Sequence, residues 1–164
     1  MPLRSWCRVV LIGATIAGAA GCSSSEGHEP APGGSSIPAD AIDAARQACV
    51  DRINAYRATE GKPPYERWLE GEGCADEQAR IDAQQNEGHA SFGRCDERAQ
   101  NTCLRRRDLD SIVGDCLQTM WDEGPGSFPE HGHYLNMAST QYSRVACGFF
   151  ELEDGRVWAN QNFH

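Results

Sequence analysis

The first periodic stretch of the chain predicts an amphipathic helix. Apolar side chains recur at the three- and four-residue spacing of one helix face, at Ile42, Ala45, Cys49, Ile53 and Tyr56. Ser35 or Ser36 is expected to cap this helix, with Pro38 in its first turn. The run Thr59–Pro64 contains a glycine and two prolines, and it is expected to end the helix.

A second helix is predicted over Cys74–Asn86, and His89 lies just beyond its end. Its apolar stripe consists of small residues that permit close packing, namely Ala75, Ala79 and Ala83. Between the two helices, Tyr65–Gly73 is expected to be a connector whose Trp68 and Leu69 enter the core.

The clearest helical pattern follows Asp108, which is expected to cap it. The apolar positions are Leu109, Ile112, Val113, Cys116, Leu117, Met120 and Trp121. Glu123 lies just past the end of this helix, and the glycines and prolines of residues 124–129 predict a loop.

The C-terminal part predicts a β-hairpin. Arg144–Leu152 and Arg156–Phe163 alternate between apolar and polar side chains, and Glu153–Gly155 supplies the turn. The polar stretch Ala90–Asp108 indicates an irregular loop. Because helices precede strands, the pattern favours an α+β domain in which helices flank an antiparallel sheet.

The N-terminus resembles a bacterial export signal. Arg4 and Arg8 precede an apolar run that is too short to span a bilayer. The junction Ala19–Cys22 is similar to a lipobox, so we expect a lipoprotein signal peptide over residues 1–21 and lipidation of Cys22. An ordinary secretory signal is the alternative. Residues 22–36 are rich in Ser, Gly and Pro and indicate a flexible tether, which leaves residues 37–164 as the domain.

The charge of the chain limits its partners. The full sequence has a formal net charge of −9. Without the two arginines of the signal, 13 basic and 24 acidic residues remain, a net charge of −11. Such a surface repels nucleic acid and anionic membranes, so we expect no nucleic-acid partner and membrane association only through the lipid anchor.

The cysteines predict a disulfide-stapled domain. Of the eight cysteines, Cys7 is removed with the signal and Cys22 is the lipidation site. The even remainder in an exported domain indicates three disulfides with fifteen possible connectivities. The six remaining cysteines are Cys49, Cys74, Cys95, Cys103, Cys116 and Cys147. Cys95 and Cys103 bracket a short polar loop, and we expect them to pair. A zinc site built from these cysteines is disfavoured because no C-x-x-C pair is present.

Two histidines and one acid are candidates for a shared site. His89 and Glu123 each follow a predicted helix, and His133 precedes a predicted strand. Two imidazoles and one carboxylate are able to hold a divalent ion such as zinc and leave one coordination position for water. His131 would point the same way as His133 in an extended chain, and we expect it to be a bystander. Tyr134 is either part of the site or part of the core.

Nucleophilic catalysis is disfavoured by the same sequence. The paired cysteines leave no free thiolate. Ser139 and Ser143 lack the glycine context of a nucleophile elbow. Neither a P-loop nor a dinucleotide-binding glycine pattern is present.

Two blocks near the C-terminus resemble a known family. Gly132–Asn136 (GHYLN) and Val145–Phe149 (VACGF) are similar to the G-H-Y-T-Q and V-G-C-G blocks of the CAP superfamily, or SCP domain. The family includes cysteine-rich secretory proteins, venom antigens and plant pathogenesis-related proteins. Asn54–Arg57 followed by Gly61–Pro64 is similar to its N-x-Y-R…G-x-P-P motif. Two further regions agree in order: Trp68 with Cys74–Arg80, and Met120–Glu123.

The resemblance implies an α-β-α sandwich stapled by disulfides, with a cavity lined by two histidines and two acids that holds a divalent metal in some members. His89, Glu123 and His133 match three of these positions. The fourth acid, in a G-E-N triplet, falls on Gln100, next to Asn101. A glutamine keeps a hydrogen-bond acceptor but removes a general base, which disfavours a hydrolase.

We therefore expect a lipid-anchored envelope protein or an extracellular protein that acts as a binding or interaction module rather than as an enzyme. Its partner would be a small molecule, a lipid or an envelope component. The expected cleft residues are His89, Gln100, Asn101, Glu123, His133 and Tyr134, with zinc as the possible cofactor. Two alternatives stay open: a metal-dependent hydrolase with Glu97 or Glu123 as base, and a lipid or sterol carrier with Phe128, Tyr134 and Tyr142 lining a groove.

Overall fold

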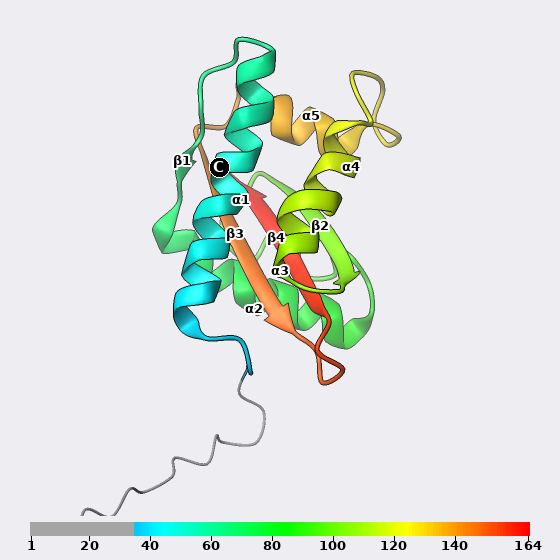
Figure 1. The fold of residues 1–164 in the computed structure, drawn as a ribbon. Coiled ribbons are helices and arrows are strands. Elements are labelled where there is room, and N and C mark those ends of the chain that lie inside the picture. Colours follow the sequence, from blue (N-terminus) through cyan, green and yellow to red (C-terminus); the bar gives the residue numbers. More distant parts are fainter. Residues whose placement is uncertain (1–34) are drawn as a thin grey trace, which may run out of the picture. The chain divides into compact units, whose positions relative to one another are not determined.

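The computed structural model describes residues 35–164, which form one compact unit with a sheet between two layers of helices (Figure 1). The predicted signal peptide and all of the predicted tether except Ser35 and Ser36 lie outside the described residues. The helices are α1 (Ala39–Thr59), α2 (Leu69–Gln85), α3 (Leu109–Ser111), the π-helical segment η1 (Ile112–Cys116), α4 (Leu117–Trp121) and α5 (Gly132–Ala138). The strands are β1 (Glu66–Arg67), β2 (Ala99–Arg106), β3 (Arg144–Glu151) and β4 (Val157–Phe163).

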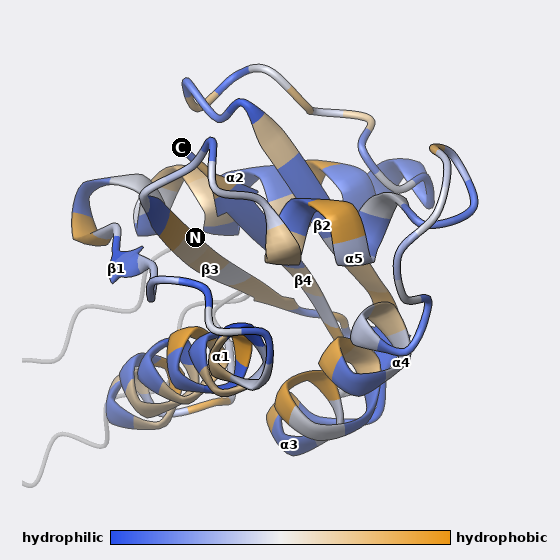
Figure 2. Cartoon of the chain, turned by 90° about the horizontal axis from the view of Figure 1, so that it is seen from above, coloured by the Kyte–Doolittle hydropathy of each residue, from blue (hydrophilic) through white to orange (hydrophobic). Residues whose placement is uncertain are grey.

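The four strands form a mixed sheet in the order β1-β3-β4-β2. The pairs β3–β4 and β4–β2 are antiparallel, and only the two-residue β1 pairs in parallel with β3. Viewed from above, α2 covers one face of the sheet, whereas α1, α3 and α4 cover the other (Figure 2). The expected α+β sandwich is confirmed. No helix within residues 35–164 has the length and hydropathy that a membrane span requires.

The apolar face of the sheet carries the main core. Its buried residues come from α1, the α3–α4 segment and the alternate strand positions that point toward them. Ile53, Ile112 and Leu117 are completely buried there. The disulfides Cys49–Cys147 and Cys103–Cys116 join this helical layer to the sheet.

The other face packs closely against α2, as the alanine stripe predicted. Ala75, Ala79 and Ala83 are buried against the sheet. A Cβ atom at Gly148 of β3 would lie 2.2 Å from the backbone carbonyl carbon of Ala75, so only glycine permits this approach. The third disulfide, Cys74–Cys95, ties α2 to the loop that precedes β2.

The sequence predicted the third helix and the hairpin correctly. Asp108 caps α3 in a capping box: its carboxylate accepts from the Ser111 N–H at 2.8 Å, and the Ser111 hydroxyl accepts from the Asp108 N–H. A π-helical turn interrupts the otherwise continuous helix at Ile112–Cys116.

Several predictions were wrong. No side chain caps α1, because Ser35 and Ser36 bond to Glu151 instead. Helix α2 begins at Leu69, five residues earlier than expected, so Trp68 precedes it directly and Leu69 is exposed rather than in the core. Residues 99–106 of the predicted loop 90–108 form strand β2 instead. The expected disulfide Cys95–Cys103 does not form, because the two cysteines bond to Cys74 and Cys116 on opposite faces of the sheet.

Candidate functional site: a histidine–glutamate pair at the start of α5

Glu123 meets His133 at the N-terminus of α5. One carboxylate oxygen, Oε1, lies 2.5 Å from the His133 ring Nδ1. The other, Oε2, accepts from the backbone N–H groups of His133 at 3.1 Å and Tyr134 at 3.3 Å. Because N–H groups in the first turn of a helix have no intrahelical partner, Glu123 replaces the missing N-cap. His133 thus lies in a helix, so the extended chain in which His131 and His133 would point the same way is not formed here.

This arrangement fixes which ring nitrogen of His133 is available. A carboxylate only accepts hydrogen bonds, so Nδ1 carries the proton that points at Glu123. Among the described residues, nothing hydrogen-bonds to Nε2, and the His133 side chain is 38% exposed. The Glu123 carboxylate therefore orients the His133 ring so that the unprotonated nitrogen, Nε2, is available to solvent. Carboxylate-oriented imidazoles of this kind serve as ligands and as proton acceptors.

Arg57 stabilises the C-terminal end of α5. Its Nη1 donates to the carbonyls of Met137 and Ser139, both at 2.7 Å, and its guanidinium lies 3.6 Å from the Tyr65 ring centroid. Arg57 is 1% exposed, and burial lowers its pKa. The last carbonyls of a helix have no intrahelical hydrogen-bond donor and favour a cation. Arg57 supplies both the donor and the positive charge at this end of α5.

Two asparagines tie α5 to strand β2. The Asn136 side chain donates to the Asn101 side-chain oxygen at 2.9 Å, and the Asn101 amide donates to the His133 carbonyl at 3.1 Å. Asn101 is fully buried. These bonds fix the backbone of His133. Helix α5 is thus held by Glu123 at its N-terminus, by Arg57 at its C-terminus and by the two asparagines between them.

Tyr134 borders the pair on the core side. It is 7% exposed, and its ring packs against Trp121 with centroids 4.8 Å apart. Its hydroxyl donates to Glu60. Burial, followed by the neighbouring Glu60 carboxylate, raises the pKa of Tyr134 to about 12. Tyr134 is thus mainly a core residue with one hydrogen-bonded polar tip.

His131 stabilises the loop between α4 and α5. Its Nδ1 donates to the backbone carbonyls of Glu123 at 2.6 Å and Gly124 at 3.0 Å. The ring also packs on Gly126, where a Cβ atom would lie 2.2 Å from it. His131 therefore holds the segment that carries Glu123.

His89 has a similar environment on the other face of the sheet. Its Nδ1 lies 2.9 Å from the Gln100 side-chain oxygen and 3.3 Å from the Thr102 hydroxyl. The residue is exposed and has a left-handed backbone with φ of 65°, which is uncommon outside glycine and is associated with functional sites. No bond to its Nε2 is found within residues 35–164.

The structure brings together two of the three predicted ligands. Gln100 and Asn101 are neighbours in β2, and their side chains point to opposite faces of the sheet. Gln100 reaches His89, whereas Asn101 contacts the backbone of His133. No group of three or more His, Cys, Asp or Glu side chains within residues 35–164 is close enough to hold a metal ion. Each of the two imidazoles is oriented through its Nδ1, His89 by Gln100 and His133 by Glu123.

A buried polar network beneath α2 was missed from the sequence. Gln78 donates to Glu97 at 2.6 Å, and its oxygen accepts from Gln100 at 3.0 Å and Asn162 at 2.6 Å. Asp82 accepts from Ser91 and from the side chain of Asn160. The available signal was Asn160-Gln161-Asn162, three consecutive amides inside a predicted strand. Most buried amide groups are hydrogen-bonded, so three amides in a buried strand predict polar partners nearby.

Glu97 is part of this network. It is 6% exposed, and its two oxygens accept from the backbone N–H groups of Gly93 and Cys95 as well as from Gln78. The carboxylate thereby holds the loop that carries His89. The geometry does not support Glu97 as the base of a hydrolase.

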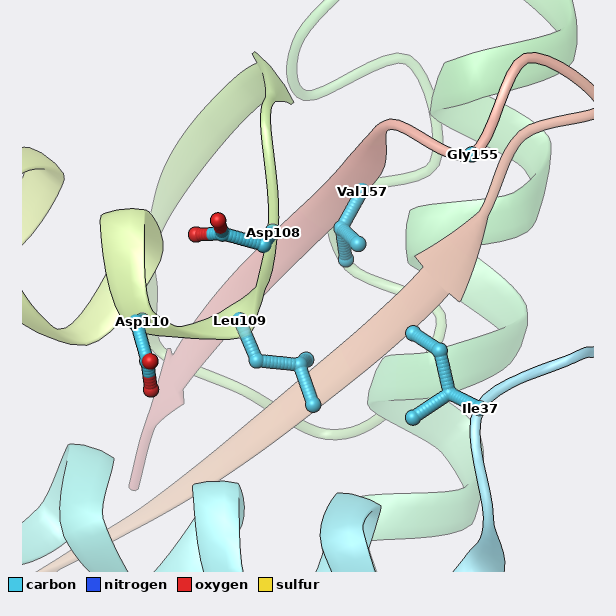
Figure 3. Close-up of a pocket in the computed structure, with 6 residues that line it drawn as sticks. All are labelled: Ile37, Asp108, Leu109, Asp110, Gly155 and Val157. Atoms are coloured by element: carbon cyan, nitrogen blue, oxygen red, sulfur yellow. The ribbon is translucent and has the colours of Figure 1, made fainter.

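Two pockets lie at the opposite end of the sheet, next to the β3–β4 turn. The smaller pocket, of about 330 Å³, is lined by Ile37, Asp108, Leu109, Asp110, Gly155 and Val157 (Figure 3). The larger pocket, of about 980 Å³, lies between α2 and the end of β3. Neither contains a predicted cleft residue.

Comparison with known proteins identifies the fold. No family model and no curated protein matches the sequence. The structure is similar to that of Na-ASP-1, with a TM-score of 0.52 and 15% identity over 74% of this chain and 38% of the other. It is also similar to the hookworm platelet inhibitor, with a TM-score of 0.52 and 14% identity over 80% of this chain and 72% of that protein. The chain thus spans little more than a third of the Na-ASP-1 chain. It has the CAP fold that its motifs predicted.

Proposed function

We propose that the protein is an exported binding module of CAP type whose site is the His133–Glu123 pair. The observation that supports this most is the orientation of His133: a carboxylate holds Nδ1, Arg57 and Asn101 fix the helix, and Nε2 faces solvent. A side chain held on rigid elements with one free polar atom is suited to binding. Export is supported by three disulfides in the described domain.

A small-molecule screen by NMR tests this proposal. A library of sugars, amino acids and dicarboxylates would be titrated into the ¹⁵N-labelled mature protein. We expect bound compounds to shift the amide signals of His133, Tyr134 and the preceding loop. His133→Ala should abolish these shifts, whereas His89→Ala should leave them unchanged. Shifts that cluster elsewhere, or that survive His133→Ala, would refute the proposed site.

A divalent metal held by His89, Glu123 and His133 is a separate proposal. It would require Glu123 to give up its contact with the His133 ring, because that contact is with Nδ1 and the nitrogen free to bind a metal is Nε2. The side-chain arrangement of the described residues does not fit a three-ligand site, so no chemical step is assigned to a metal. Elemental analysis of the mature protein tests the proposal. One zinc per chain, lost in both histidine variants, would support it, and metal-dependent hydrolysis would then favour the enzyme alternative.

Lipid anchoring through Cys22 is proposed from the sequence. The expected result is a mature N-terminus at Cys22 with a mass increase equal to its acyl groups, which mass spectrometry of membrane-extracted protein would show. Cys22→Ser should release the protein into the soluble fraction. An unmodified N-terminus would indicate the secretory alternative. A lipid or sterol carrier would require stoichiometric lipid in an organic extract of the purified domain.

A further inference from the structure

The first described residues are bound to the end of strand β3. Glu151, the last residue of β3, accepts from the hydroxyls of Ser35 at 2.8 Å and Ser36 at 2.6 Å. It also accepts from the backbone N–H groups of Ser36 at 2.7 Å and Ile37 at 3.2 Å. One carboxylate thus receives four hydrogen bonds from three consecutive residues. Such charge-assisted bonds are stronger than neutral ones and define a specific local conformation.

Ile37 adds an apolar contact to these polar ones. It lies half-buried in the smaller pocket, opposite Leu109 and below Val157 (Figure 3). It packs against the edge of the main core without being part of it. A partly buried aliphatic side chain of this kind contributes less than a core residue, because only part of its surface leaves water.

The same segment borders the larger pocket. Ser35 and Ser36 line that pocket, and both pockets reach Gly155 of the hairpin turn. The apolar residues that line the larger pocket are Ile42, Phe149, Phe150 and Leu152. The segment therefore contributes Ile37 to the pocket of about 330 Å³ and Ser35 and Ser36 to the pocket of about 980 Å³.

Pro38 separates this segment from α1. Its φ of −58° and ψ of 145° are extended rather than helical, and the helix hydrogen bonds begin with Ile42 N–H donating to the Pro38 carbonyl. A proline also disfavours a helical conformation in the residue that precedes it. A change of conformation before Pro38 would therefore leave the hydrogen bonds of α1 unchanged.

We propose that Ser35–Ile37 is a strap that closes a groove at the hairpin end of the domain. When Glu151 releases the strap, the two pockets join into one groove that runs from Leu109 and Val157 to Phe150 and Leu152. Within residues 35–164, the contacts that hold the strap are those with Glu151 and those of Ile37, so it opens without global unfolding, as weakly attached segments do. This device is independent of the His133–Glu123 pair, which lies at the other end of the sheet.

Hydrogen exchange of the full mature protein tests the strap. In Glu151→Ala, the amides of Ser36 and Ile37 should exchange at least about tenfold faster, while the Phe149 amide, bonded to Asp76, keeps its rate. Binding of the neutral dye Nile red should increase because the joined groove is exposed. Glu153→Ala is the matched control, since Glu153 is an exposed acid in the turn after β3 that also lines the larger pocket, and no hydrogen bond is found for it within residues 35–164. It should change neither reading.

A double variant, Ser35→Ala with Ser36→Ala, removes the hydroxyl donors without altering β3. It should also accelerate exchange of the Ile37 amide, by a smaller factor, and it keeps the test valid if Glu151→Ala unfolds. The strap is refuted if Ser36 and Ile37 exchange equally fast in the native protein and in both variants. It is also refuted if their exchange accelerates while Nile red binding stays constant, because the pockets would then not join.

Discussion

On one face of the sheet, α1 and the α3–α4 segment bury aliphatic and aromatic side chains around two disulfides. On the other face, α2 packs its alanines against the sheet and buries a chain of amides and two carboxylates. The first face tolerates imperfect contacts at a cost proportional to the area or volume lost. The second depends on geometry, because each unpaired polar group there carries a desolvation penalty. The apolar contacts of the first face stabilise the fold, whereas the hydrogen bonds of the second face fix the loop that carries His89.

The largest effect is expected where α2 approaches the sheet most closely. Gly148→Ala would place a methyl group 2.2 Å from backbone atoms of α2, so the helix must shift. We expect the free energy of unfolding to fall by at least about 3 kcal/mol in urea denaturation. Gly73→Ala, within α2 itself, meets nothing within 4 Å and should stabilise by about 0.5–1 kcal/mol. Similar values for the two variants would mean that the packing described for this face is wrong.

Disulfide reduction should distinguish the two faces next. Cys74 is only partly buried, whereas Cys49, Cys147, Cys103 and Cys116 are at most 1% exposed. A mild reductant should therefore open Cys74–Cys95 first, which is observable by alkylation and mass spectrometry. Loss of this link, which spans 21 residues, should cost about 3 kcal/mol. Labelling of Cys49 or Cys103 before Cys74 would contradict the burial that separates the faces.

An isosteric change tests the directional character of the α2 face. Asp82→Asn replaces one acceptor oxygen by an NH₂ group that must face the donors of Ser91 or the NH₂ of Asn160. We expect a loss of about 2 kcal/mol in the free energy of unfolding and faster exchange of the Ser91 amide. Asp51→Asn, at an exposed position of α1, should stay within about 0.5 kcal/mol of the native protein. An equally small effect at Asp82 would show that the network is not required.

The smallest effect concerns pH and lies at the hairpin end. Partial burial acts to raise the pKa of Glu151, but the hydrogen bonds from Ser36 and Ser35 outweigh it and lower the pKa below the ordinary value of 4.5. Because the folded pKa is depressed, the hydrogen bonds of the strap to Glu151 stabilise the protein fully above pH 4.5, and this contribution is lost as the pH falls through the folded pKa. In a carboxyl ¹³C titration, Ser36→Ala should raise the midpoint of Glu151. An unchanged midpoint would argue against the hydrogen bonds between the strap and Glu151.

The parts of the fold that the sequence predicted are those with an apolar period. Helix α1, the α3–α4 segment and the hairpin follow from side chains such as Ile53, Leu117 and Val157, whose spacing alone indicates which face is buried. Strand β2 could not be predicted in this way, because the side chains that it buries toward α2 are polar. Residues such as Gln100 are buried only because they have hydrogen-bond partners on α2 and β4. Helix α5 is short and is held by Glu123, Arg57 and Asn101 from distant segments.

The site was predictable only in part for the same reason. The family resemblance pointed to His89, Glu123 and His133, and the contact between the last two is present in the structure. That His89 pairs with Gln100 on the other side of β2 depends on strand register and on the left-handed turn at His89. Neither has a signature in the sequence. Disulfide partners likewise depend on which face each cysteine occupies.

The central claim is that Glu123 holds the His133 ring with Nδ1 protonated and Nε2 open. The most direct measurement is a two-dimensional ¹⁵N–¹H spectrum of the histidine rings, recorded at a pH at which they are neutral. It should show His133 as the Nδ1–H tautomer, and Glu123→Gln should weaken that preference. An Nε2–H tautomer of His133 in the native protein would contradict the account, because the nitrogen assigned to ligand binding would then carry the proton.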